Sequence, residues 1–331
     1  MEGERVASAE GRKWLGIIPL FDPKEGSTVV EPPGTGPGYW SGAASAIYDD
    51  AERFFLYYRV RKPLEQGRGG RCYIAQSDDG LRFSPIWTAT KEQFGSESIE
   101  RAALTRSLEG RFRLYISYVD AKSRKWRIDL LEADSPERFD PAQRQSVLRA
   151  EDVGSEGVKD PYVTIVGRRY YMFVHYAPRA LQPPDATPGE LHGTGNIFAT
   201  EKGRGSSGLA LSDDGLHFRW AGDVLPPGKR WDRKLTRVDT VLYRPLIFTL
   251  LYSGRSSVEE TYEDATGLAV SADLRHFHKL TEGAPALVSP HGTGALRYTD
   301  AVPVGDEVFY YYECAREDGS HELRMSRVTR Y

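Results

Sequence analysis

The sequence predicts an all-β fold, specifically a five-bladed β-propeller of four-stranded antiparallel blades. The first observation is a repeated phrase: Gln-Ser-Asp-Asp-Gly-Leu-Arg-Phe at 76–83 returns almost unchanged at 211–218. Looser copies occupy 270–277 and 133–139. The second observation is that short runs rich in aromatic and β-branched residues precede each copy. Thirdly, no long amphipathic helical pattern occurs. A structural unit repeated in this way is typical of propellers.

Each repeat unit contains three strand-like runs separated by turn residues such as Asp49-Asp50, Gly110 and Gly167. The predicted strands are 43–48, 53–60 and 72–77; 102–107, 111–118 and 126–133; 162–166, 169–176 and 208–212; 240–243, 246–252 and 267–271; and 301–304, 307–313 and 322–328. These runs give one domain with approximate blades at 39–95, 96–150, 157–225, 235–285 and 295–331.

The repeated phrase predicts where the fourth, outer strand of each blade begins. Its Asp and Gly residues reverse the chain, and we expect its Phe to pack between sheets. The last unit lacks such a strand before Tyr331. The apolar run 14–21 is therefore predicted to supply it and to close the ring. A pair of β-sandwiches is the rival fold, but sandwiches do not repeat one phrase at this spacing.

Composition narrows the classes of function. The chain has 331 residues and a net charge of −3, so neither a nucleic-acid partner nor a membrane surface is expected. Only Cys72 and Cys314 occur, which excludes a disulfide framework and favours two buried thiols. The charged N-terminal residues lead into no long apolar run, so we expect no signal peptide and a cytoplasmic location.

No pattern in the sequence indicates a metal or a cofactor. The Ser-Asp-Asp-Gly phrases lack the glutamate that completes an EF-hand loop. No zinc-ligand spacing, P-loop or dinucleotide fingerprint is found. His192-Gly193-Thr194-Gly195 and His291-Gly292-Thr293-Gly294 repeat one tetrapeptide. Turns of similar composition explain them more simply than ligand-binding loops do, although His291 is kept as a binding candidate.

Two long segments interrupt the strand pattern. Residues 178–207 are rich in Pro, Gly and Thr, and residues 32–38 form a Gly/Pro loop before the first blade. Long irregular segments inside a compact domain are often functional. The longer one is a candidate to shape the mouth of a central pocket.

Carboxylates open four of the five predicted blades. The innermost strands of a propeller line its central channel, and their starts converge at one mouth. The candidate catalytic residues at these starts are Glu100, Asp160, Asp239 and Asp300. Crowded carboxylates raise one another's pKa, so a ring of them has an energetic cost. Two carboxyl groups across a pocket suit glycoside hydrolysis. The alternative is that these residues only cap strand starts.

Further residues near the same mouth are candidates for substrate binding. Aromatic rings there could stack on a sugar, although core packing is the commoner fate of a tyrosine. Polar and charged neighbours could bind hydroxyl or anionic groups. The complete set is Tyr39, Trp40, Ser41, Arg101, Lys159, Tyr162, His175, Arg237, His291 and Tyr298.

These motifs resemble those of the five-bladed propeller glycosidases. The pattern of an aromatic strand followed by Ser-x-Asp-Gly, with Lys159-Asp160-Pro161 opening a blade, is similar to glycoside hydrolase families 43, 32, 62 and 130. The runs 54–60 and 73–80 together look like the first blade of the family 130 mannoside phosphorylases and mannosidases. The resemblance implies the propeller fold and cleavage of a glycosidic bond.

The catalytic positions depart from these families. Families 43 and 32 open the first blade with an Asp, where this chain has Ser41-Gly42-Ala43. Family 130 carries Glu-Asp-Pro-Arg in the second blade, where this chain has Glu100-Arg101-Ala102-Ala103. Asp160-Pro161 is intact. Glu313-Cys314 resembles the acid-bearing Glu-Cys of family 32 but falls in a middle strand, which indicates coincidence.

The leading hypothesis is a glycoside hydrolase-like enzyme acting on a small glycoside or oligosaccharide in the central funnel. Glu100 and Asp239 would be proton donor and base, and Asp160 would orient substrate or tune a pKa. The second hypothesis is a phosphorylase whose phosphate site uses Arg101, Lys159, Arg237 and Arg297. A non-catalytic carbohydrate-binding propeller, or one repurposed to non-sugar chemistry, are the remaining alternatives.

Overall fold

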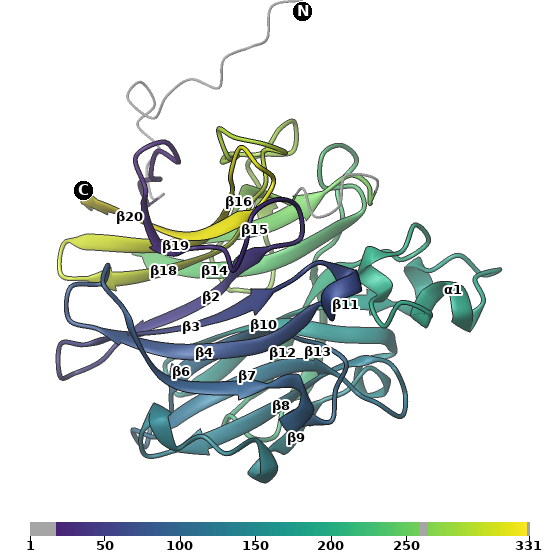
Figure 1. Cartoon of the computed structure of the whole chain (residues 1–331), viewed down its shortest axis with the longest axis horizontal. Coiled ribbons are helices and arrows are strands. Elements are labelled where there is room, and N and C mark those ends of the chain that lie inside the picture. Colours follow the sequence, from purple (N-terminus) through teal and green to yellow (C-terminus); the bar gives the residue numbers. More distant parts are fainter. Residues whose placement is uncertain (1–17, 259–263, 330–331) are drawn as a thin grey trace, which may run out of the picture.

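The computed structural model describes residues 18–258 and 264–329 and is all-β (Figure 1). Five sets of strands follow one another along the chain. They are β2 (Trp40–Tyr48), β3 (Phe54–Arg61), β4 (Gly69–Ser77) and β5 (Ser84–Thr90); β6 (Ile99–Arg106), β7 (Phe112–Val119), β8 (Trp126–Ala133) and β9 (Gln145–Leu148); β10 (Ser155–Val166), β11 (Arg169–Pro178), β12 (Ser206–Ser212) and β13 (Arg219–Leu225); β14 (Leu235–Arg244), β15 (Ile247–Arg255), β16 (Ala265–Ser271) and β17 (His278–Lys279); and β18 (Leu296–Val304), β19 (Glu307–Ala315) and β20 (His321–Thr329) with β1 (Ser27–Val30).

The second, third and fourth sets are separate four-stranded antiparallel sheets. The first and fifth sets join into one eight-stranded sheet through a single parallel pairing of Trp40 with His321. Figure 1 shows β18 and β19 beside β2, although they lie at opposite ends of the chain. The first strands contact one another in circular order, β2 with β6, β6 with β10, β10 with β14, β14 with β18 and β18 with β2. The predicted all-β class and four-stranded antiparallel sheets are confirmed, and the arrangement is consistent with a propeller.

The N-terminal strand differs from the prediction. Residues 14–17 lie outside the described residues, and residues 18–21 form no strand. Instead the Phe21 ring packs 4.4 Å from the Tyr312 ring. The strand that pairs with β20 is β1, with Ser27 opposite Met325 and Val30 opposite Leu323. Ile18 and Phe21 therefore belong to a hydrophobic core, and the β-branched residues that follow make the strand.

The repeated phrase forms a turn, as predicted, and its residues contact a neighbouring set of strands. The Gly80 amide donates to Ser77 Oγ at 3.0 Å, and Gly80 adopts φ +71°. The following Phe83 packs edge-on against Tyr311 of β19. The Tyr311 hydroxyl also donates to the Gly80 carbonyl at 2.8 Å. The copy at 212–218 repeats these contacts, with Tyr115 of β7 donating to the Gly215 carbonyl at 2.7 Å.

Each first strand carries a one-residue bulge near its start. The register shifts lie between Gly42 and Ser45 in β2, Ile99 and Ala102 in β6, Lys159 and Tyr162 in β10, Val238 and Thr240 in β14, and Arg297 and Asp300 in β18. The backbone is left-handed at Ala43, Asp160 and Tyr298. Bulges redirect side chains relative to the regular alternation of a strand. All five strands therefore redirect a side chain at an equivalent position.

The long segment between β11 and β12 contains the short helix α1 (Pro188–His192) and lies at one side of the molecule (Figure 1). It is tied to the sheets, because His192 Nε2 contacts Glu156 Oε2 at 2.9 Å. Cys72 and Cys314 are buried free thiols, as predicted. No helix within 18–258 or 264–329 has the length and apolar character needed to cross a membrane.

Replacing Gly80 by Ala tests how much the close packing of this turn contributes to stability. An added Cβ would lie 2.9 Å from the Phe309 ring, and the alanine would also have to adopt a positive φ. We expect the free energy of unfolding to fall by about 2–3 kcal/mol, measured by urea denaturation. Gly167→Ala is the control, because its φ is +63° but nothing lies within 4 Å of the added Cβ. Its loss should be about 1 kcal/mol, and equal losses in the two variants would contradict the packing argument.

Candidate active site

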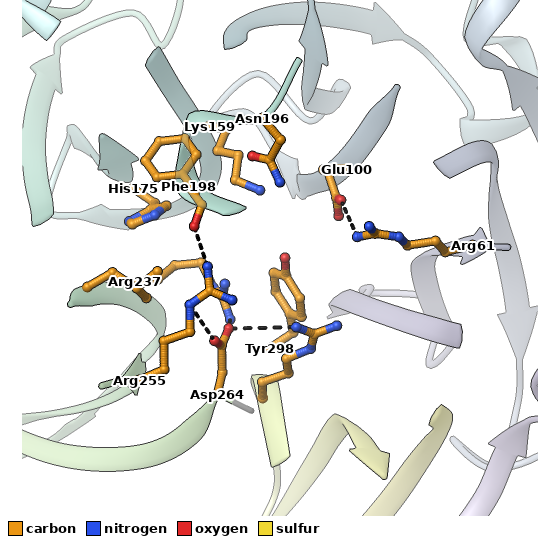
Figure 2. Close-up of a pocket in the computed structure, with 12 residues that line it drawn as sticks. Arg61, Glu100, Lys159, His175, Asn196, Phe198, Arg237, Arg255, Asp264 and Tyr298 are labelled. Carbon is orange, nitrogen blue, oxygen red and sulfur yellow. Dashed lines mark hydrogen bonds and ion pairs between the residues drawn. The ribbon is translucent and has the colours of Figure 1, made fainter. Parts of the chain in front are cut away.

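A small polar pocket lies where the bulged first strands meet (Figure 2). It has about 20 Å³ of space, enough for about one water molecule. The residues that line it are Arg61, Glu100, Lys159, His175, Asn196, Phe198, Leu235, Arg237, Arg255, Asp264, Arg297 and Tyr298. Five of the predicted site residues are among them: Glu100, Lys159, His175, Arg237 and Tyr298.

The bulges set the direction of a side chain near the start of each first strand. Glu100, Asp160, Asp239 and Tyr298 occupy equivalent bulge positions in β6, β10, β14 and β18, and Ala43 takes that place in β2. In the fifth set, Tyr298 therefore occupies the position that a carboxylate occupies in β6, β10 and β14. Asp300 lies two residues further along, where its carboxylate accepts the amides of Ala46 and Ala301 at 2.8 and 2.9 Å. Burial raises the pKa of Asp300.

Tyr298 stands at the centre of a group of guanidinium ions. The Arg237 guanidinium lies 3.7 Å from the centre of the Tyr298 ring, and that of Arg297 lies 5.3 Å from it. Figure 2 shows the hydroxyl pointing into the pocket. Burial raises the pKa of Tyr298, and the negative charge of Asp160 raises it further. The phenol is therefore neutral and available as a hydrogen-bond donor.

Glu100 is the buried carboxylate on the opposite wall. Its Oε2 accepts from Arg59 Nε at 2.9 Å, and its Oε1 lies 3.4 Å from Arg61 Nη1. Burial alone would raise the pKa of Glu100, but the charges of Arg59, Lys159 and Arg61 outweigh this effect and hold the pKa below its usual range. Glu100 therefore remains ionised at neutral pH.

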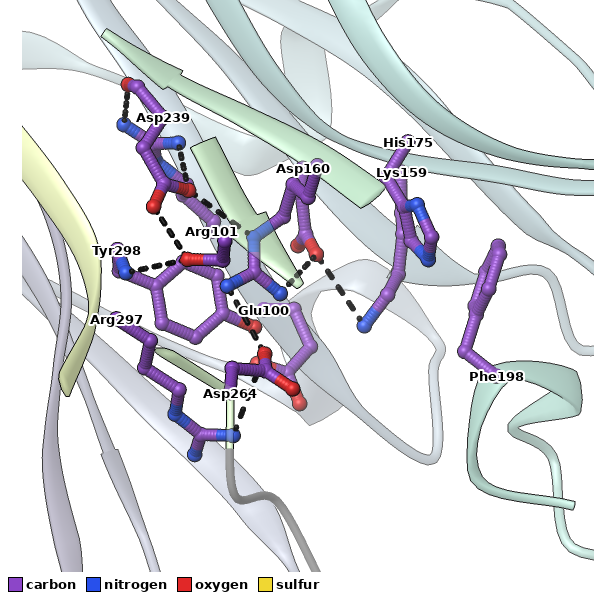
Figure 3. A network of polar contacts seen from close by, with 12 residues as sticks. Glu100, Arg101, Lys159, Asp160, His175, Phe198, Asp239, Asp264, Arg297 and Tyr298 are labelled. Atoms are coloured by element: carbon purple, nitrogen blue, oxygen red, sulfur yellow. Dashed lines mark hydrogen bonds and ion pairs between the residues drawn. The ribbon is translucent and has the colours of Figure 1, made fainter. Parts of the chain in front are cut away.

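Lys159 and Asp160 form a buried pair beside Glu100 (Figure 3). Lys159 Nζ lies 3.4 Å from Asp160 Oδ2 and 4.7 Å from the centre of the Trp126 ring. Neither Asp160 oxygen has a hydrogen-bond partner among the described residues, and the nearest other cation is Arg237 at 3.7 Å. Burial lowers the pKa of Lys159, although Asp160 and Glu100 partly oppose this.

His175 presents a hydrogen-bond acceptor to the pocket. Its Nδ1 lies 2.8 Å from the Thr236 carbonyl, so Nδ1 carries the proton. Its buried Nε2 has no hydrogen-bond partner within the described part of the chain. Burial holds the pKa of His175 well below its usual value, and the charges of Lys159 and Arg237 lower it further. The ring is therefore neutral, with a free lone pair on Nε2.

Several pocket residues were not predicted from the sequence. Asp264 precedes β16, and its Oδ2 lies 3.1 Å from Arg237 Nη2. Arg255 ends β15, and its Nη2 donates to the Phe198 carbonyl. Asn196 and Phe198 come from the long segment after β11, which thus contributes two residues to the pocket lining. Asp264 and Arg255 are charged, but neither lies at the start of a predicted first strand, where the site residues were expected.

Arg101 and Asp239 pack behind the pocket and join the sheets across the centre of the molecule (Figure 3). Arg101 donates to the Asp239 carbonyl at 2.6 Å and to the Ala44 carbonyl at 3.2 Å. The Asp239 carboxylate also accepts from Ser253 Oγ and from the Thr299 amide. Burial raises the pKa of Asp239, although Arg237 and Arg101 oppose this shift. Both residues are enclosed by protein and do not line the pocket.

The remaining candidates lie outside the pocket lining. The Tyr162 hydroxyl donates to the Val241 carbonyl at 3.1 Å, and Ser41 Oγ donates to the Glu31 carbonyl at 2.8 Å. Trp40 stacks on His321 with the ring centres 4.7 Å apart. The Tyr39 hydroxyl pairs with Gln66. His291 is partly exposed and lies 3.6 Å from Glu317.

Glu313, which resembled the Glu of family 32, is a buried structural partner in β19. Its Oε1 accepts from Arg297 Nη2 at 2.6 Å and lies 2.8 Å from His321 Nδ1. Burial alone would raise the pKa of Glu313, but Arg297 and Arg59 hold it well below its usual value. Across residues 18–258 and 264–329, no group of three or more His, Cys, Asp and Glu side chains is arranged to hold a metal ion.

Comparisons with known proteins agree with this architecture. No protein-family model matches the sequence, and no curated protein matches it. A solved glycoside hydrolase is similar, with a TM-score of 0.68 and 12% identity over 92% of each chain. The β-1,2-mannobiose phosphorylase from Listeria innocua, solved with β-1,2-mannobiose, has a TM-score of 0.62 and 15% identity over 91% of this chain and 94% of its own. A thermostable family-43 glycoside hydrolase has a TM-score of 0.61 and 15% identity over 92% of each chain.

These likenesses show that the chain has the fold of the propeller glycosidases, and they confirm the resemblance seen in the sequence at that level. At 12–15% identity they carry the fold and not the activity. The function has to be argued from the pocket.

Arg101→Met tests the electrostatic link behind the pocket. Removing the guanidinium leaves the buried Asp239 with one fewer cation, so we expect a loss of about 3–5 kcal/mol in the free energy of unfolding. Adding Asp239→Asn should recover part of this loss, and urea denaturation of both single variants and the double variant measures the coupling. Strictly additive effects would contradict a direct link between the two side chains.

Proposed function

We propose that this chain is a carbohydrate-active enzyme that cleaves a small glycoside or oligosaccharide by hydrolysis at the central pocket. The observation that carries the proposal is the equivalent bulge in each first strand. It directs Glu100 and Tyr298 into one pocket and places Asp160 directly behind Lys159. Carboxylates near one pocket suit glycoside cleavage, and the shared fold of solved glycoside hydrolases supports the same reading.

We further propose that the five strand sets are the blades of one closed ring within a single domain. The circular contacts of the first strands support this arrangement. In this ring β1 completes the fifth blade by pairing with β20. The blade limits would then be close to 39–95, 96–150, 157–225, 235–285 and 295–331.

The electrostatics favour a different division of roles from the one predicted. Glu100 is held ionised, so it serves as the base that activates water or as the nucleophile at the anomeric carbon. Asp239 is enclosed by protein donors, so its role is to hold the pocket together. Asp160 orients Lys159 and Arg237, since its carboxylate lies 3.4 and 3.7 Å from their cationic groups.

A proton for the leaving oxygen has to come from another group. Two pocket residues carry acidic protons at neutral pH, Lys159 and Tyr298. Burial strengthens Lys159 as an acid by lowering its pKa, and it weakens Tyr298 by raising its pKa. General acids work best when their pKa lies near the working pH. Lys159 is therefore the proposed proton donor.

A sugar ring needs more space than the 20 Å³ available in this structure. Asn196 and Phe198 belong to the long segment after β11 and do not come from a first strand. Displacing these two side chains opens the pocket without disturbing the bulges. Glycoside binding is therefore expected to rearrange residues 196–198 first.

Phosphorolysis is a second candidate, favoured by the number of cations in the pocket. Lys159, Arg237 and Arg297 all line it, and a phosphate bound there would replace water as the attacking group. Release of a sugar 1-phosphate that depends on added phosphate distinguishes this reaction from hydrolysis.

The carboxylate roles predict the effects of two isosteric changes. Glu100→Gln and Asp160→Asn should each lower kcat/KM by about 10²–10⁴-fold, because the charge is lost while the shape is kept. Asn also tolerates the left-handed backbone at position 160. The measurement is a rate assay on a panel of aryl glycosides, with thermal unfolding to establish that each variant folds. Asp213→Asn is the control, because Asp213 is exposed and forms an ion pair with the surface residue Arg169. Full turnover in both pocket variants would exclude this mechanism.

The assignment of Lys159 predicts a dependence on the leaving group. Lys159→Gln should slow cleavage of alkyl glycosides by about 10²–10³-fold and barely affect dinitrophenyl glycosides, whose leaving group needs no proton. The protonated amine is the active form and its pKa is lowered, so wild-type activity should fall with rising pH at a midpoint below that of an ordinary lysine. An equal loss on both kinds of glycoside would assign the proton donor elsewhere.

A further inference from the structure

The pocket lining carries an excess of positive charge. Of the described lining residues, five are cationic (Arg61, Lys159, Arg237, Arg255 and Arg297) and two are carboxylates (Glu100 and Asp264). His175 adds no charge, since its pKa is held well below neutrality by burial. Tyr298 is also uncharged, since burial raises its pKa.

The groups immediately behind the lining do not cancel this excess. Asp160, Asp239 and Glu313 pair with the lining cations, but Arg59 and Arg101 are buried among them and add two positive charges. The cluster then contains seven cations and five carboxylates. Including Asp300, whose carboxylate accepts the amides of Ala46 and Ala301, still leaves the cations in the majority.

Excess charge of one sign is costly to bury, because the protein interior solvates it poorly. An anion that enters the pocket removes this cost and gains charge-assisted hydrogen bonds from guanidinium groups. Arg61 and Arg255 reach the pocket from different sides (Figure 2). The geometry therefore favours an anionic group between them.

The neutral groups of the pocket indicate that the ligand is more than a bare anion. His175 Nε2 is a buried acceptor without a hydrogen-bond partner among the described residues, so it needs a donor. A carboxylate oxygen only accepts, whereas a sugar hydroxyl donates. A ligand that satisfies both the guanidinium groups and His175 carries an acidic group and a hydroxyl together.

We propose that the pocket recognises an acidic sugar, binding the carboxylate of a uronic acid among Arg61, Arg237, Arg255 and Arg297 and one of its hydroxyl groups at His175. This assignment rests on the proposed function, since it names the substrate class for the same site. Arginine side chains bind carboxylates through paired hydrogen bonds.

Calorimetry with the full chain tests the proposal directly. The probes are D-glucuronate, D-galacturonate and D-mannuronate, each compared with the neutral hexose of the same configuration, together with inorganic phosphate. At least one uronate should bind tenfold or more tightly than its neutral hexose and than phosphate. Binding of the neutral hexoses as tightly as the uronates, or tighter binding of phosphate, would overturn the proposal, and so would no binding of any uronate.

Variants locate the binding energy. Arg255→Gln and Arg61→Gln should each reduce the preference for the uronate over its neutral hexose by about tenfold, and Arg255→Lys should keep most of it. Arg169→Gln is the matched control, because Arg169 is half exposed and forms an ion pair with the surface residue Asp213. Thermal unfolding identifies any variant that fails to fold. An unchanged preference in both folded pocket variants would contradict the assignment.

The same experiments separate this inference from the proposed function. Tight uronate binding without cleavage of nitrophenyl uronides or uronate-containing oligosaccharides supports the acidic-sugar site and contradicts the proposed enzyme activity. Cleavage of neutral glycosides with no preference for uronides overturns the acidic-sugar site and leaves the proposed activity standing.

Discussion

One extra residue at the same point of each first strand creates the pocket, and the rest of the site depends on it. Side chains along a regular strand alternate between two faces. The bulge breaks this alternation and turns Glu100, Asp160 and Tyr298 toward the centre. The unusual backbone at Asp160 and Tyr298 is held by the neighbouring sheets, because their amides donate to Ser117 Oγ and Ser253 Oγ at 2.8 and 3.2 Å. The strained positions are thus stabilised by the same contacts that join the sheets.

The buried charges then divide the chemistry among these positions. Arg59 and Arg61 keep Glu100 ionised, whereas burial against Trp126 and Phe198 makes the Lys159 ammonium easier to deprotonate. Arg101 and Asp239 lie behind and supply stability. Two carboxylates at equivalent positions, Glu100 and Asp239, therefore differ in role because one borders the pocket and the other is enclosed by donors. An acidic substrate would offset the excess positive charge of the pocket.

Much of the fold could be predicted from the sequence, and part of the site could not. Counting from the repeated phrase located the strands and the bulged segments, because the phrase marks the same turn in four of the five units. The phrase does not show where a single extra residue lies within a strand. Asp300 was therefore predicted as the site residue of β18, although Tyr298 occupies the position equivalent to Glu100 and Asp160. Asp264, Arg255, Asn196 and Phe198 reach the pocket from strand ends and a long segment, and only the three-dimensional path of the chain brings them there. An apolar stretch such as 18–21 can be buried with or without forming a strand, so its composition alone does not distinguish the two.

The most direct test is a crystal structure of the Asp160→Asn variant with a bound glycoside that the wild-type protein cleaves. We expect the anomeric carbon to lie within about 3–3.5 Å of the Glu100 carboxylate, the distance of a near-attack geometry. Asn196 and Phe198 should have moved from their present positions. A glycoside bound elsewhere, such as in the groove lined by Phe21, Phe309 and Met325, with Glu100 and its arginine partners unchanged, would exclude the proposed site.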